Sequence, residues 1–438
     1  MQDIPDAVLS RTALGITDCI AVALTTRDEP EVARFRELAL QRGSRSEATV
    51  FGAPARRTDR EWSAVVNSLA MTTAELDGGY DKTACHAALY TVPALLAESE
   101  ASGLSVIEML RAGALAYELT ARIALAWAPV GNSYPPLYTH SRFGAIGAAV
   151  AGALTRHASG DELMRTLNIA ATLITVGPRN HLMRGALARN VWPAAATWNG
   201  MMAAQWSACG IDGLATSVYD VYSGVLGFSA EAEKLTVDLG DDWAVMHGYV
   251  RMHACHLFCN PLVDALIEVR GKLVADGNLG AIGEITVEAH EEALHLTDSH
   301  PATSLAARFS LPHLAAATLL LGNASTAAFA TNALARDDIV ALRAKVRVRP
   351  FDMTQAQGHH WPSAVEVTAA GKTYRAVRLT ARGGHGEPFS SNDVLEKIDA
   401  LTSGPYPDFG KVMREMIALT PYRLSENCSS LIETACHG

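Results

Sequence analysis

Residues 144–154 read Gly-Ala-Ile-Gly-Ala-Ala-Val-Ala-Gly-Ala-Leu, and this stretch decides the fold class of the chain. Glycine and alanine dominate it, so neighbouring helices could approach it closely. A helix of this composition offers little polar surface to solvent and therefore belongs in the middle of a helical bundle. The stretch predicts a mainly α-helical protein with these residues at its centre.

Helical patterning continues on both sides of this stretch, from the N-terminus to about residue 245. Two Ser-x-x-Glu sequences, Ser105 with Glu108 and Ser159 with Glu162, match the capping box that opens many helices. Each is followed by apolar residues at helical spacing. The first part of the chain is therefore expected to be helical almost throughout.

After about residue 280 the pattern changes, because apolar and polar residues alternate as they do in strands. The alternating apolar positions are Ile285 and Val287, Val346 and Val348, and Val365 and Val367. A helical stretch over 310–334 lies between the strands, and the sequence Ala-Ala-Gly-Lys over 369–372 predicts a hairpin turn. This part has the size of a small α/β domain.

Helical patterning returns over 391–401, where Ser390 and Ser391 are candidate caps. A chain of 438 residues is too long for one compact core, so two domains are expected. We expect a mainly α protein, in which both chain ends form a large all-helical domain and a smaller α/β (α+β) lid is inserted between them. The expected segments are 1–248 and 391–438 for the helical domain and 249–390 for the lid.

Composition and charge exclude several classes of partner. Hydrophobic residues at 49% and charged residues at 19% describe an ordinary globular protein with a generous core. The net charge of −10 disfavours nucleic acid or an anionic membrane as a partner. It leaves room for an anionic small substrate, because a pocket can carry its own positive field.

Several targeting and cofactor signals are missing from the sequence. The first residues lack the basic start and apolar core of a secretory signal, and the apolar run near 311–322 is too short to span a bilayer. Seven cysteines, few and odd in number, do not form a disulfide framework, so reduced thiols and a cytoplasmic location are expected. No dinucleotide-binding, P-loop or nucleophile-elbow motif occurs.

The first group of chemically active residues follows a break in a helix, in Asp77-Gly-Gly-Tyr80-Asp-Lys82-Thr-Ala-Cys85-His86. The two glycines leave these side chains on an irregular loop, where catalytic groups often concentrate. Histidine is the usual proton-transfer residue near neutral pH. The alternative is an ordinary polar turn between helices, which composition alone favours.

A second group is basic and contains Arg179, His181, Arg184 and Arg189 just before a helix that starts near Pro193. A helix N-terminus combined with guanidinium groups makes a good cradle for a carboxylate or phosphate. The alternative is a solvated basic face, and the pattern alone slightly favours it.

A third group, Arg251-Met-His253-Ala-Cys255-His256-Leu-Phe-Cys259, invites comparison with a zinc site. The spacing argues against zinc, because one such run would not close a tetrahedral site and no second Cys/His pair completes it. Core thiols with hydrogen-bonded histidines are the expected interpretation. We therefore expect no metal.

Taken together, these stretches resemble the MmgE/PrpD family, which includes 2-methylcitrate dehydratase, cis-aconitate decarboxylase and iminodisuccinate epimerase. The resemblance covers nearly the whole chain. Its landmarks are Asp18 in Ile-Thr-Asp-Cys-Ile-Ala, Asn67 in Val-Asn-Ser-Leu-Ala, Asp77-Gly-Gly with His86 and Val92-Pro-Ala, Tyr117-Glu118 with Arg122, Phe143 with Gly147, Pro301-Ala-Thr303, Arg308-Phe-Ser-Leu-Pro312, and Pro388-Phe-Ser with Lys397.

The resemblance implies a helical domain built from both chain ends, an inserted lid and a homodimer. It implies chemistry at a carbon next to a carboxylate, without metal or organic cofactor. His86 falls on the family's motif histidine and Asp77 on its loop aspartate.

The chain departs from the family at several positions that matter for proton transfer. Arg189 and Arg251 stand where the family has lysines, Tyr138 stands where it has a histidine, with His140 nearby, and Asn260 replaces a further histidine. Arginine can bind a carboxylate through two hydrogen bonds, but it cannot be deprotonated in a protein and so cannot act as a base. These departures preserve anion recognition and remove two proton-transfer candidates.

These residues support a mechanistic hypothesis. Arg189 and Arg251 would bind the substrate carboxylate, and His86, oriented by Asp77, would act as general acid/base. The expected residues for the second proton are Tyr138, His140 and His253, and those for further substrate contacts are Tyr80, Lys82 and Arg184. A dehydratase-type lyase acting on a small carboxylated substrate is the first expectation. The alternatives are an isomerase or epimerase, a decarboxylase, or a protein that binds an anion without catalysis.

Overall fold

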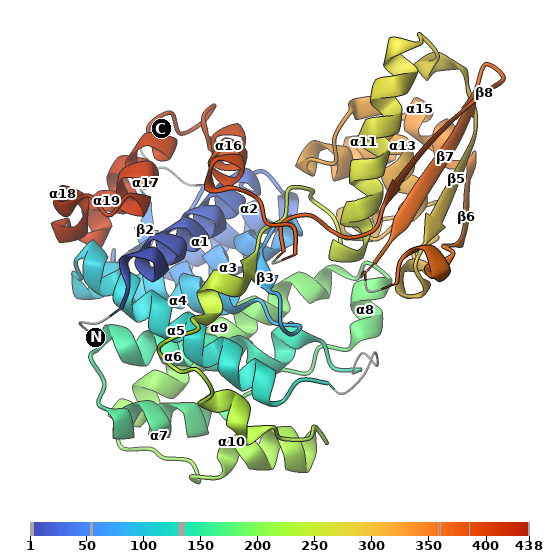
Figure 1. Ribbon diagram of the computed structural model, residues 1–438. Coiled ribbons are helices and arrows are strands. Elements are labelled where there is room, and N and C mark those ends of the chain that lie inside the picture. The colour runs from blue at the N-terminus through green and yellow to red at the C-terminus, as the bar shows by residue number, and fades with distance from the viewer. Residues whose placement is uncertain are drawn as a thin grey trace.

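The computed structural model of this chain describes residues 4–52, 56–129, 136–357, 359, 361–384 and 386–436. It consists of a large helical body and a smaller α/β body beside it (Figure 1). Helix α1 (Asp6–Thr25) from the N-terminus packs against α16 (Ser391–Thr402) and α17 (Phe409–Ile417) from the C-terminal part. The predicted fold class, a mainly helical protein with an inserted α/β part, is confirmed.

Helix α6 (Thr139–Thr155) lies at the centre of the helical body, and every one of its residues is buried. It packs against α4 (Ala87–Ser102), α5 (Val106–Ala126), α7 (Gly160–Ala171) and α9 (Val191–Ala208). The central position predicted from its small residues is confirmed. This helix matters for function because its first residues are candidate site residues.

Two glycines of α6 explain how its neighbours approach so closely. A Cβ atom at Gly144 would lie 2.6 Å from the Cβ of Ala196 on α9. A Cβ atom at Gly147 would lie 2.6 Å from the Cβ and 2.9 Å from the carbonyl carbon of Tyr90 on α4. Such distances are too short for any larger residue, so glycine at these positions sets the spacing of three helices.

Local start signals predicted from the sequence are confirmed with small adjustments. Both capping boxes form, and in the second Ser159 N donates to Glu162 Oε2 at 2.7 Å. Helix α9 begins at Val191, two residues before Pro193, because proline is tolerated in a first helical turn. The other helices of this body are α2 (Pro30–Arg42), α3 (Arg60–Thr73), α8 (Arg179–Met183), α10 (Ser217–Tyr219), α18 (Pro421–Ser425) and α19 (Cys428–Ala435).

The α/β body contains a four-stranded mixed sheet in the order β6-β5-β7-β8. Strand β5 (Ile282–Ala289) runs parallel to β6 (Val346–Pro350) and antiparallel to β7 (Ser363–Ala369), which pairs with β8 (Lys372–Arg378). The predicted strands and the hairpin turn are confirmed, and Ala370 at φ 50° forms that turn with the following glycine. Helices α11 and α13 lie beside this sheet (Figure 1).

The predicted helical stretch over 310–334 is interrupted. Helix α13 (Leu311–Leu321) ends at Gly322, whose φ of 83° places it in the left-handed region that closes many helices. The remaining helices of the lid are α11 (Asn260–Ala275), α12 (Ser304–Arg308), α14 (Thr331–Leu334) and α15 (Asp337–Arg343).

Two short ladders complete the fold. Strands β1 (Ala48–Thr49) and β2 (Arg57–Thr58) pair within the helical body, and β3 (Gly79–Tyr80) pairs with β4 (Gly248–Tyr249). The second ladder joins the loop after α3 to the segment that enters the lid. This connection is what brings the two candidate site segments together.

The two bodies share buried apolar surface. The core of the lid includes Leu76, Tyr138 and Trp192 from the helical body, so no solvent layer separates them at this point. The domain boundaries after residues 248 and 390 stay predictions.

Buried helices and free thiols agree with an ordinary globular interior. Within the described ranges α1 is the one helix long and apolar enough to cross a membrane, but 78% of its most apolar window is buried inside the molecule. The apolar run near 311–322, which the sequence shows to be too short for a membrane span, corresponds to α13. All seven cysteines are free, and only Cys209 is exposed.

Candidate active site

The loop that follows α3 is held by its own carbonyl groups. Three consecutive carbonyl oxygens each accept a hydrogen bond from a buried basic side chain. The pairs are Arg308 to Ala74 (3.0 Å), Arg251 to Glu75 (3.1 Å) and Lys397 to Leu76 (3.4 Å). The donors come from the lid, from the segment that enters the lid and from α16. Three separate parts of the chain therefore fix the residues that precede Asp77.

His86 is the residue before α4, and its side chain is buried beside Asp77. Its Nδ1 hydrogen-bonds to the carbonyl oxygen of Gly78 at 2.9 Å and lies 2.8 Å from Asp77 Oδ2. Both neighbours are acceptors, so the ring proton is assigned to Nδ1 and the lone pair to Nε2. This nitrogen is the atom of His86 that can accept a proton from a ligand.

Asp77 is buried and stays ionised. Burial on its own would raise the pKa of this carboxyl, but His86 and then Arg251 and Arg189 lower it to about 2. A permanent negative charge beside His86 stabilises the imidazolium form that follows proton uptake.

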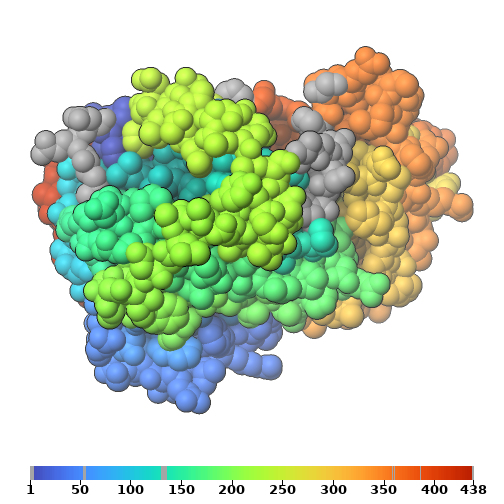
Figure 2. Space-filling view, turned by 90° about the horizontal axis from the view of Figure 1, so that it is seen from below, coloured from blue at the N-terminus to red at the C-terminus, as the bar shows by residue number. Residues whose placement is uncertain are grey.

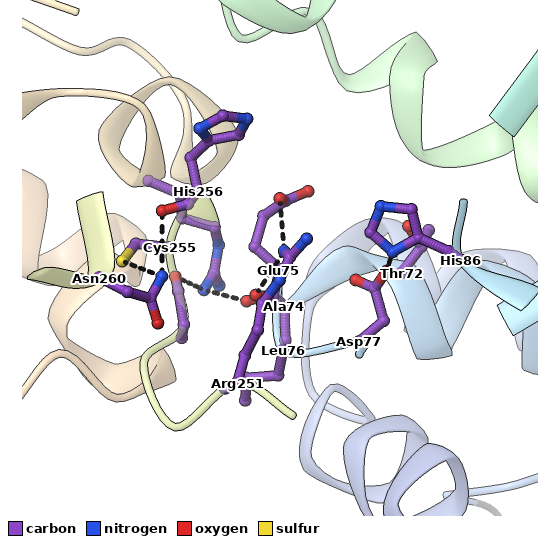
Figure 3. A network of polar contacts seen from close by, with 12 residues as sticks. Thr72, Ala74, Glu75, Leu76, Asp77, His86, Arg251, Cys255, His256 and Asn260 are labelled. Atoms are coloured by element: carbon purple, nitrogen blue, oxygen red, sulfur yellow. Dashed lines mark hydrogen bonds and ion pairs between the residues drawn. The ribbon is translucent and has the colours of Figure 1, made fainter. Parts of the chain in front are cut away.

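Arg189 and Arg251 both contact the carboxylate of Glu75. Figure 3 shows Arg251 beside this carboxylate. Arg189 Nη2 forms an ion pair with Glu75 Oε1, and Arg251 Nη1 lies 3.2 Å from Glu75 Oε2. Glu75 is completely buried, and its φ of 54° is rare for a residue with a side chain. Sequence reasoning missed Glu75, although an acid two positions before Asp77 at a helix end was a usable signal.

Each arginine keeps donor capacity beyond this shared carboxylate. Arg189 Nη1 donates to the Thr72 hydroxyl at 2.8 Å. The Nε atoms of Arg189 and Arg251 are buried without a hydrogen-bond partner in the part of the chain that the structure describes. An unsatisfied buried donor costs free energy, and an oxygen atom of a ligand can recover it.

Tyr138 and His140 face this cluster from the start of α6. Their rings lie 4.8 Å apart at right angles, and His140 lies 4.9 Å from the His86 ring. Burial raises the pKa of Tyr138, whose ring lies 5.8 Å from the Arg189 guanidinium. Burial, then Arg189 and His86, hold the pKa of His140 well below its ordinary value. His140 is thus a neutral imidazole at neutral pH.

His256 lies on the lid side of the cluster, where its ring packs against Phe258 and Phe309 at 4.3 and 4.6 Å. Burial and then the charges of Arg251, Arg179 and Arg189 hold its pKa well below the ordinary value. His256 is therefore a neutral, buried imidazole at the lid side of the site.

Asp77, His86 and His140 form the one group of potential metal ligands within the described ranges, and their ligand atoms lie within 4.8 Å of one another. Within this group His86 Nδ1 lies 2.8 Å from Asp77 Oδ2, which is a hydrogen-bond distance, so these two side chains bind each other. Two guanidinium groups beside the site also oppose a further cation. The geometry fits proton transfer and anion binding better than metal binding.

The cysteines of the third sequence group are core residues. Cys255 and Cys259 are completely buried, and burial raises the pKa of both thiols. Neutral thiols in this setting are poor metal ligands.

Four residues that the sequence proposed for the site lie outside this cluster. Tyr80 lies in β3, where burial and then Glu118 raise its pKa. Lys82 pairs at the surface with Asp242 at 2.7 Å. The remaining two are Arg184, exposed at the end of α8, and His253, whose Nε2 lies 2.9 Å from Asp264 Oδ1 on α11.

Comparison with known families accounts for this arrangement along nearly the whole chain. Residues 1–238 match the MmgE/PrpD N-terminal domain, and residues 253–418 match the MmgE/PrpD C-terminal domain. The chain belongs to the MmgE/PrpD family. Its curated relatives include the cis-aconitate decarboxylase-like protein oryM of Aspergillus oryzae (strain ATCC 42149 / RIB 40). The two are 23% identical over 426 residues, which cover 92% of this chain and 88% of that protein.

In this MmgE/PrpD protein the candidate site lies where the two family domains meet. Asp77, His86, His140 and Arg189 fall in the N-terminal domain match, and Arg251 falls in the short segment between the two matches. His256 falls just inside the C-terminal match.

Proposed function

We propose that this MmgE/PrpD enzyme is a lyase of the dehydratase type that acts on a small carboxylated substrate, by proton transfer at the carbon next to a carboxylate. The observation that carries the proposal is the buried cluster in which Asp77 and Gly78 hold His86 through Nδ1, while two guanidinium groups share the carboxylate of Glu75 just before Asp77. The family of small-carboxylate enzymes to which the chain belongs supports the same substrate class. No metal or organic cofactor is required for these steps.

His86 is the proposed general acid/base. Its Nδ1 proton is held by the Gly78 carbonyl, so Nε2 is the atom that exchanges a proton with the substrate. Asp77 remains a carboxylate during this exchange and stabilises the imidazolium form. The pair thus provides both the base for proton abstraction and the acid for proton return.

Arg189 and Arg251 are the proposed electrostatic partners of the substrate. Proton abstraction beside a carboxylate moves negative charge onto its oxygens, and fixed guanidinium groups in a closed site stabilise that charge. Glu75 holds both guanidinium groups in place before a ligand arrives. As arginines these groups stay charged throughout and take no part in proton transfer.

Decarboxylation is the second candidate, because the relative oryM is named cis-aconitate decarboxylase-like. In dehydration, His86 takes the C–H proton, the electron pair forms the C=C bond, and the C–O bond breaks to release water with a proton from a second acid. In decarboxylation, a C–C bond breaks to release carbon dioxide, and the carbon left with the electron pair takes a proton from His86. The first reaction starts with a neutral His86 and the second with a protonated one.

The proposal is tested with di- and tricarboxylates in heavy water, after a thermal-shift screen selects those that stabilise the fold by binding. Dehydration predicts loss of water and exchange of the substrate's C–H proton, whereas decarboxylation predicts one solvent deuterium in the product. Epimerisation would place deuterium at an inverted carbon.

The control variants decide whether His86 carries the chemistry. His86→Ala should lower kcat by roughly 10²- to 10⁴-fold, the usual contribution of a general acid/base. His300→Ala, an exposed histidine of the lid, should leave kcat unchanged. Unchanged turnover in His86→Ala would remove it from the mechanism. A ligand that binds without any enzyme-dependent exchange would favour the alternative of an anion-binding protein.

We also propose that two copies of the chain associate through one face of the helical body. Thirteen of the nineteen exposed large apolar side chains in the described ranges lie between residues 164 and 246. Figure 2 shows the underside of the molecule, where segments of this part of the chain cover much of the surface. Such a set of half-exposed side chains amounts to on the order of 1,000 Å², against roughly 800 Å² per partner in a standard interface. A self-complementary contact of that size suits a homodimer.

A further inference from the structure

We infer that His140 donates its Nε2–H to the oxygen on which negative charge develops during the reaction, and that Tyr90 holds His140 in the tautomer that this requires. His140 would then be a catalytic residue and Tyr90 a positioning residue. The inference rests on the proposed function, since it names the donor that stabilises the intermediate of that reaction. Tyr90 is not among the site residues predicted from the sequence.

The assignment of the His140 tautomer rests on the contacts of the Tyr90 hydroxyl. Tyr90 Oη lies 2.9 Å from His140 Nδ1 and 3.3 Å from Thr139 Oγ1. The Thr139 hydroxyl uses its own proton to bond the Ala84 carbonyl at 2.6 Å, so it can only accept from Tyr90. Of the two acceptors the imidazole nitrogen is the nearer and the more basic. The 3.3 Å contact with Thr139 is also longer than an ordinary O–H···O hydrogen bond, so we assign the Tyr90 proton to the bond with Nδ1 and the ring proton of His140 to Nε2.

The Nε2 atom of His140 has unused hydrogen-bonding capacity. It is completely buried and has no hydrogen-bond partner in the part of the chain that the structure describes. Its ring lies 4.9 Å from that of His86, the proposed acid/base. An N–H group left unpaired in a buried site gains most from an incoming oxygen atom.

The surrounding charges keep this imidazole neutral. The groups near His140 are the cations Arg189 and Arg251, the His86 ring and the carboxylate of Asp77. Burial, Arg189, His86 and Arg251 hold the pKa of His140 well below the ordinary value. The Asp77 carboxylate is paired with His86. A neutral imidazole can donate a hydrogen bond to an oxyanion without protonating it, which suits an enediolate-like intermediate.

The position of Tyr90 depends on the glycines of the central helix. Its Cβ and carbonyl carbon lie where the side chain of any residue other than glycine at position 147 would be. This close approach of α4 to α6 brings the Tyr90 hydroxyl within reach of the first turn of α6, where His140 lies. Burial also raises the pKa of Tyr90 well above its ordinary value, so the phenol keeps the proton that it donates.

The two histidines are thereby fixed in opposite tautomers. His86 has acceptors at Nδ1 and presents a lone pair at Nε2, whereas His140 accepts at Nδ1 and presents a proton at Nε2. One ring can remove a proton from carbon while the other stabilises the resulting negative oxygen. Neither needs to change its tautomer before the reaction starts.

The tautomer is measured directly by long-range ¹H–¹⁵N spectra of the full-length protein labelled with ¹⁵N-histidine, using His140→Gln to assign the signal. In the wild type, His140 should show a protonated, pyrrole-like Nε2 and an unprotonated, pyridine-like Nδ1 at neutral pH. Tyr90→Phe removes only the phenol oxygen and should produce a mixture of both tautomers. A pyridine-like Nε2 in the wild type would overturn the inference, whatever reaction the enzyme performs.

Kinetics provide the second readout and a matched control. Tyr90→Phe should lower kcat about tenfold with little change in KM, because the donor acts on the intermediate and not on the bound substrate. Tyr222→Phe removes another buried tyrosine hydroxyl that bonds α6, at the Arg142 carbonyl, and should alter neither kcat nor the His140 spectrum. If Tyr90→Phe keeps kcat within twofold while His86→Ala is inactive, the inference fails and the proposed function stands. If no carboxylate shows enzyme-dependent exchange, the proposed function fails and His140 loses its catalytic role, although the tautomer can still be measured.

Discussion

Glu75 shows at the scale of one residue how this site is built. Its backbone has a left-handed φ of 54° at the end of α3, where glycine would be the ordinary choice. The side chain explains the exception, because it is the shared partner of Arg189 and Arg251. The sequence could not show this, since Glu75 and Arg251 are 176 positions apart and their contact depends on the packing of the two bodies.

Replacing Glu75 by Gln tests whether this carboxylate is needed to hold two buried guanidinium groups. The change removes the ion-pair partner that both buried cations share, so the free energy of unfolding should fall by about 3–5 kcal/mol. Urea unfolding at neutral pH, followed by circular dichroism, measures this loss. Glu396→Gln, an exposed acid on α16, should leave stability unchanged.

A second substitution separates charge from lost packing. In Glu75→Gln combined with Arg251→Met, one of the orphaned cations is gone, so the double variant should be less destabilised than the sum of the two single changes. Strict additivity, or a Glu75→Gln variant as stable as the wild type, would show that the shared carboxylate does not hold the arginines.

At the scale of elements, patterns that are local in sequence were predictable and contacts between elements were not. The small residues of α6, the two capping boxes and the turn at 369–372 all depend on neighbouring residues, and all are confirmed. The helical stretch predicted over 310–334 contains a break, because Gly322 ends α13 with a left-handed conformation. Tyr90 on α4 showed no signal, because its role comes from contact with a different helix.

Gly147→Ala tests whether the glycines of α6 set the spacing of the bundle. The new Cβ would lie 2.6 Å from the Cβ and 2.9 Å from the carbonyl carbon of Tyr90, and a backbone atom cannot move aside cheaply. Overpacking of this kind should lower the free energy of unfolding by about 1–3 kcal/mol. Chemical denaturation measures the change, and kcat should fall with it, because Tyr90 is pushed away from His140.

The same helix supplies the matched control. At Gly152 an added Cβ would lie 3.4 Å from the nearest atom, the Cβ of Ala204, which is an ordinary contact. Gly152→Ala should therefore be neutral or slightly stabilising, since alanine favours the helix by up to about 1 kcal/mol. Equal effects of the two substitutions would indicate a general intolerance of α6 and not a specific contact with Tyr90.

At the scale of the whole molecule, the candidate site exists only because three distant parts of the chain meet. The loop at 74–76 is held by Arg308 from the lid, by Arg251 and by Lys397 from α16. Sequence reasoning identified most of the catalytic candidates, because they lie on recognisable motifs. It could not show that His253 pairs with Asp264 and Lys82 with Asp242, because nothing local indicates which partner a side chain will contact across the molecule.

The exposed apolar face between residues 164 and 246 leads to a prediction about assembly. Leu214 and Val225 are 72% and 77% exposed, which is costly for a protein that remains a monomer in water. If this face joins two copies, the wild-type protein should sediment at twice the mass of one chain. Leu214→Asp combined with Val225→Asp places four buried carboxylates in a symmetric interface and should yield monomers, measured by analytical ultracentrifugation.

The control for assembly is Val274→Asp, which changes a side chain that is 51% exposed on α11 of the lid, outside the proposed face. This variant should remain a dimer with wild-type circular dichroism. The monomeric variant should keep the same melting curve if the face serves only for association. A dimer that survives both aspartates, or a wild-type protein that sediments as a monomer at micromolar concentration, would contradict the proposed interface. Either result would mean that the apolar face binds a different protein partner and not a second copy of this chain.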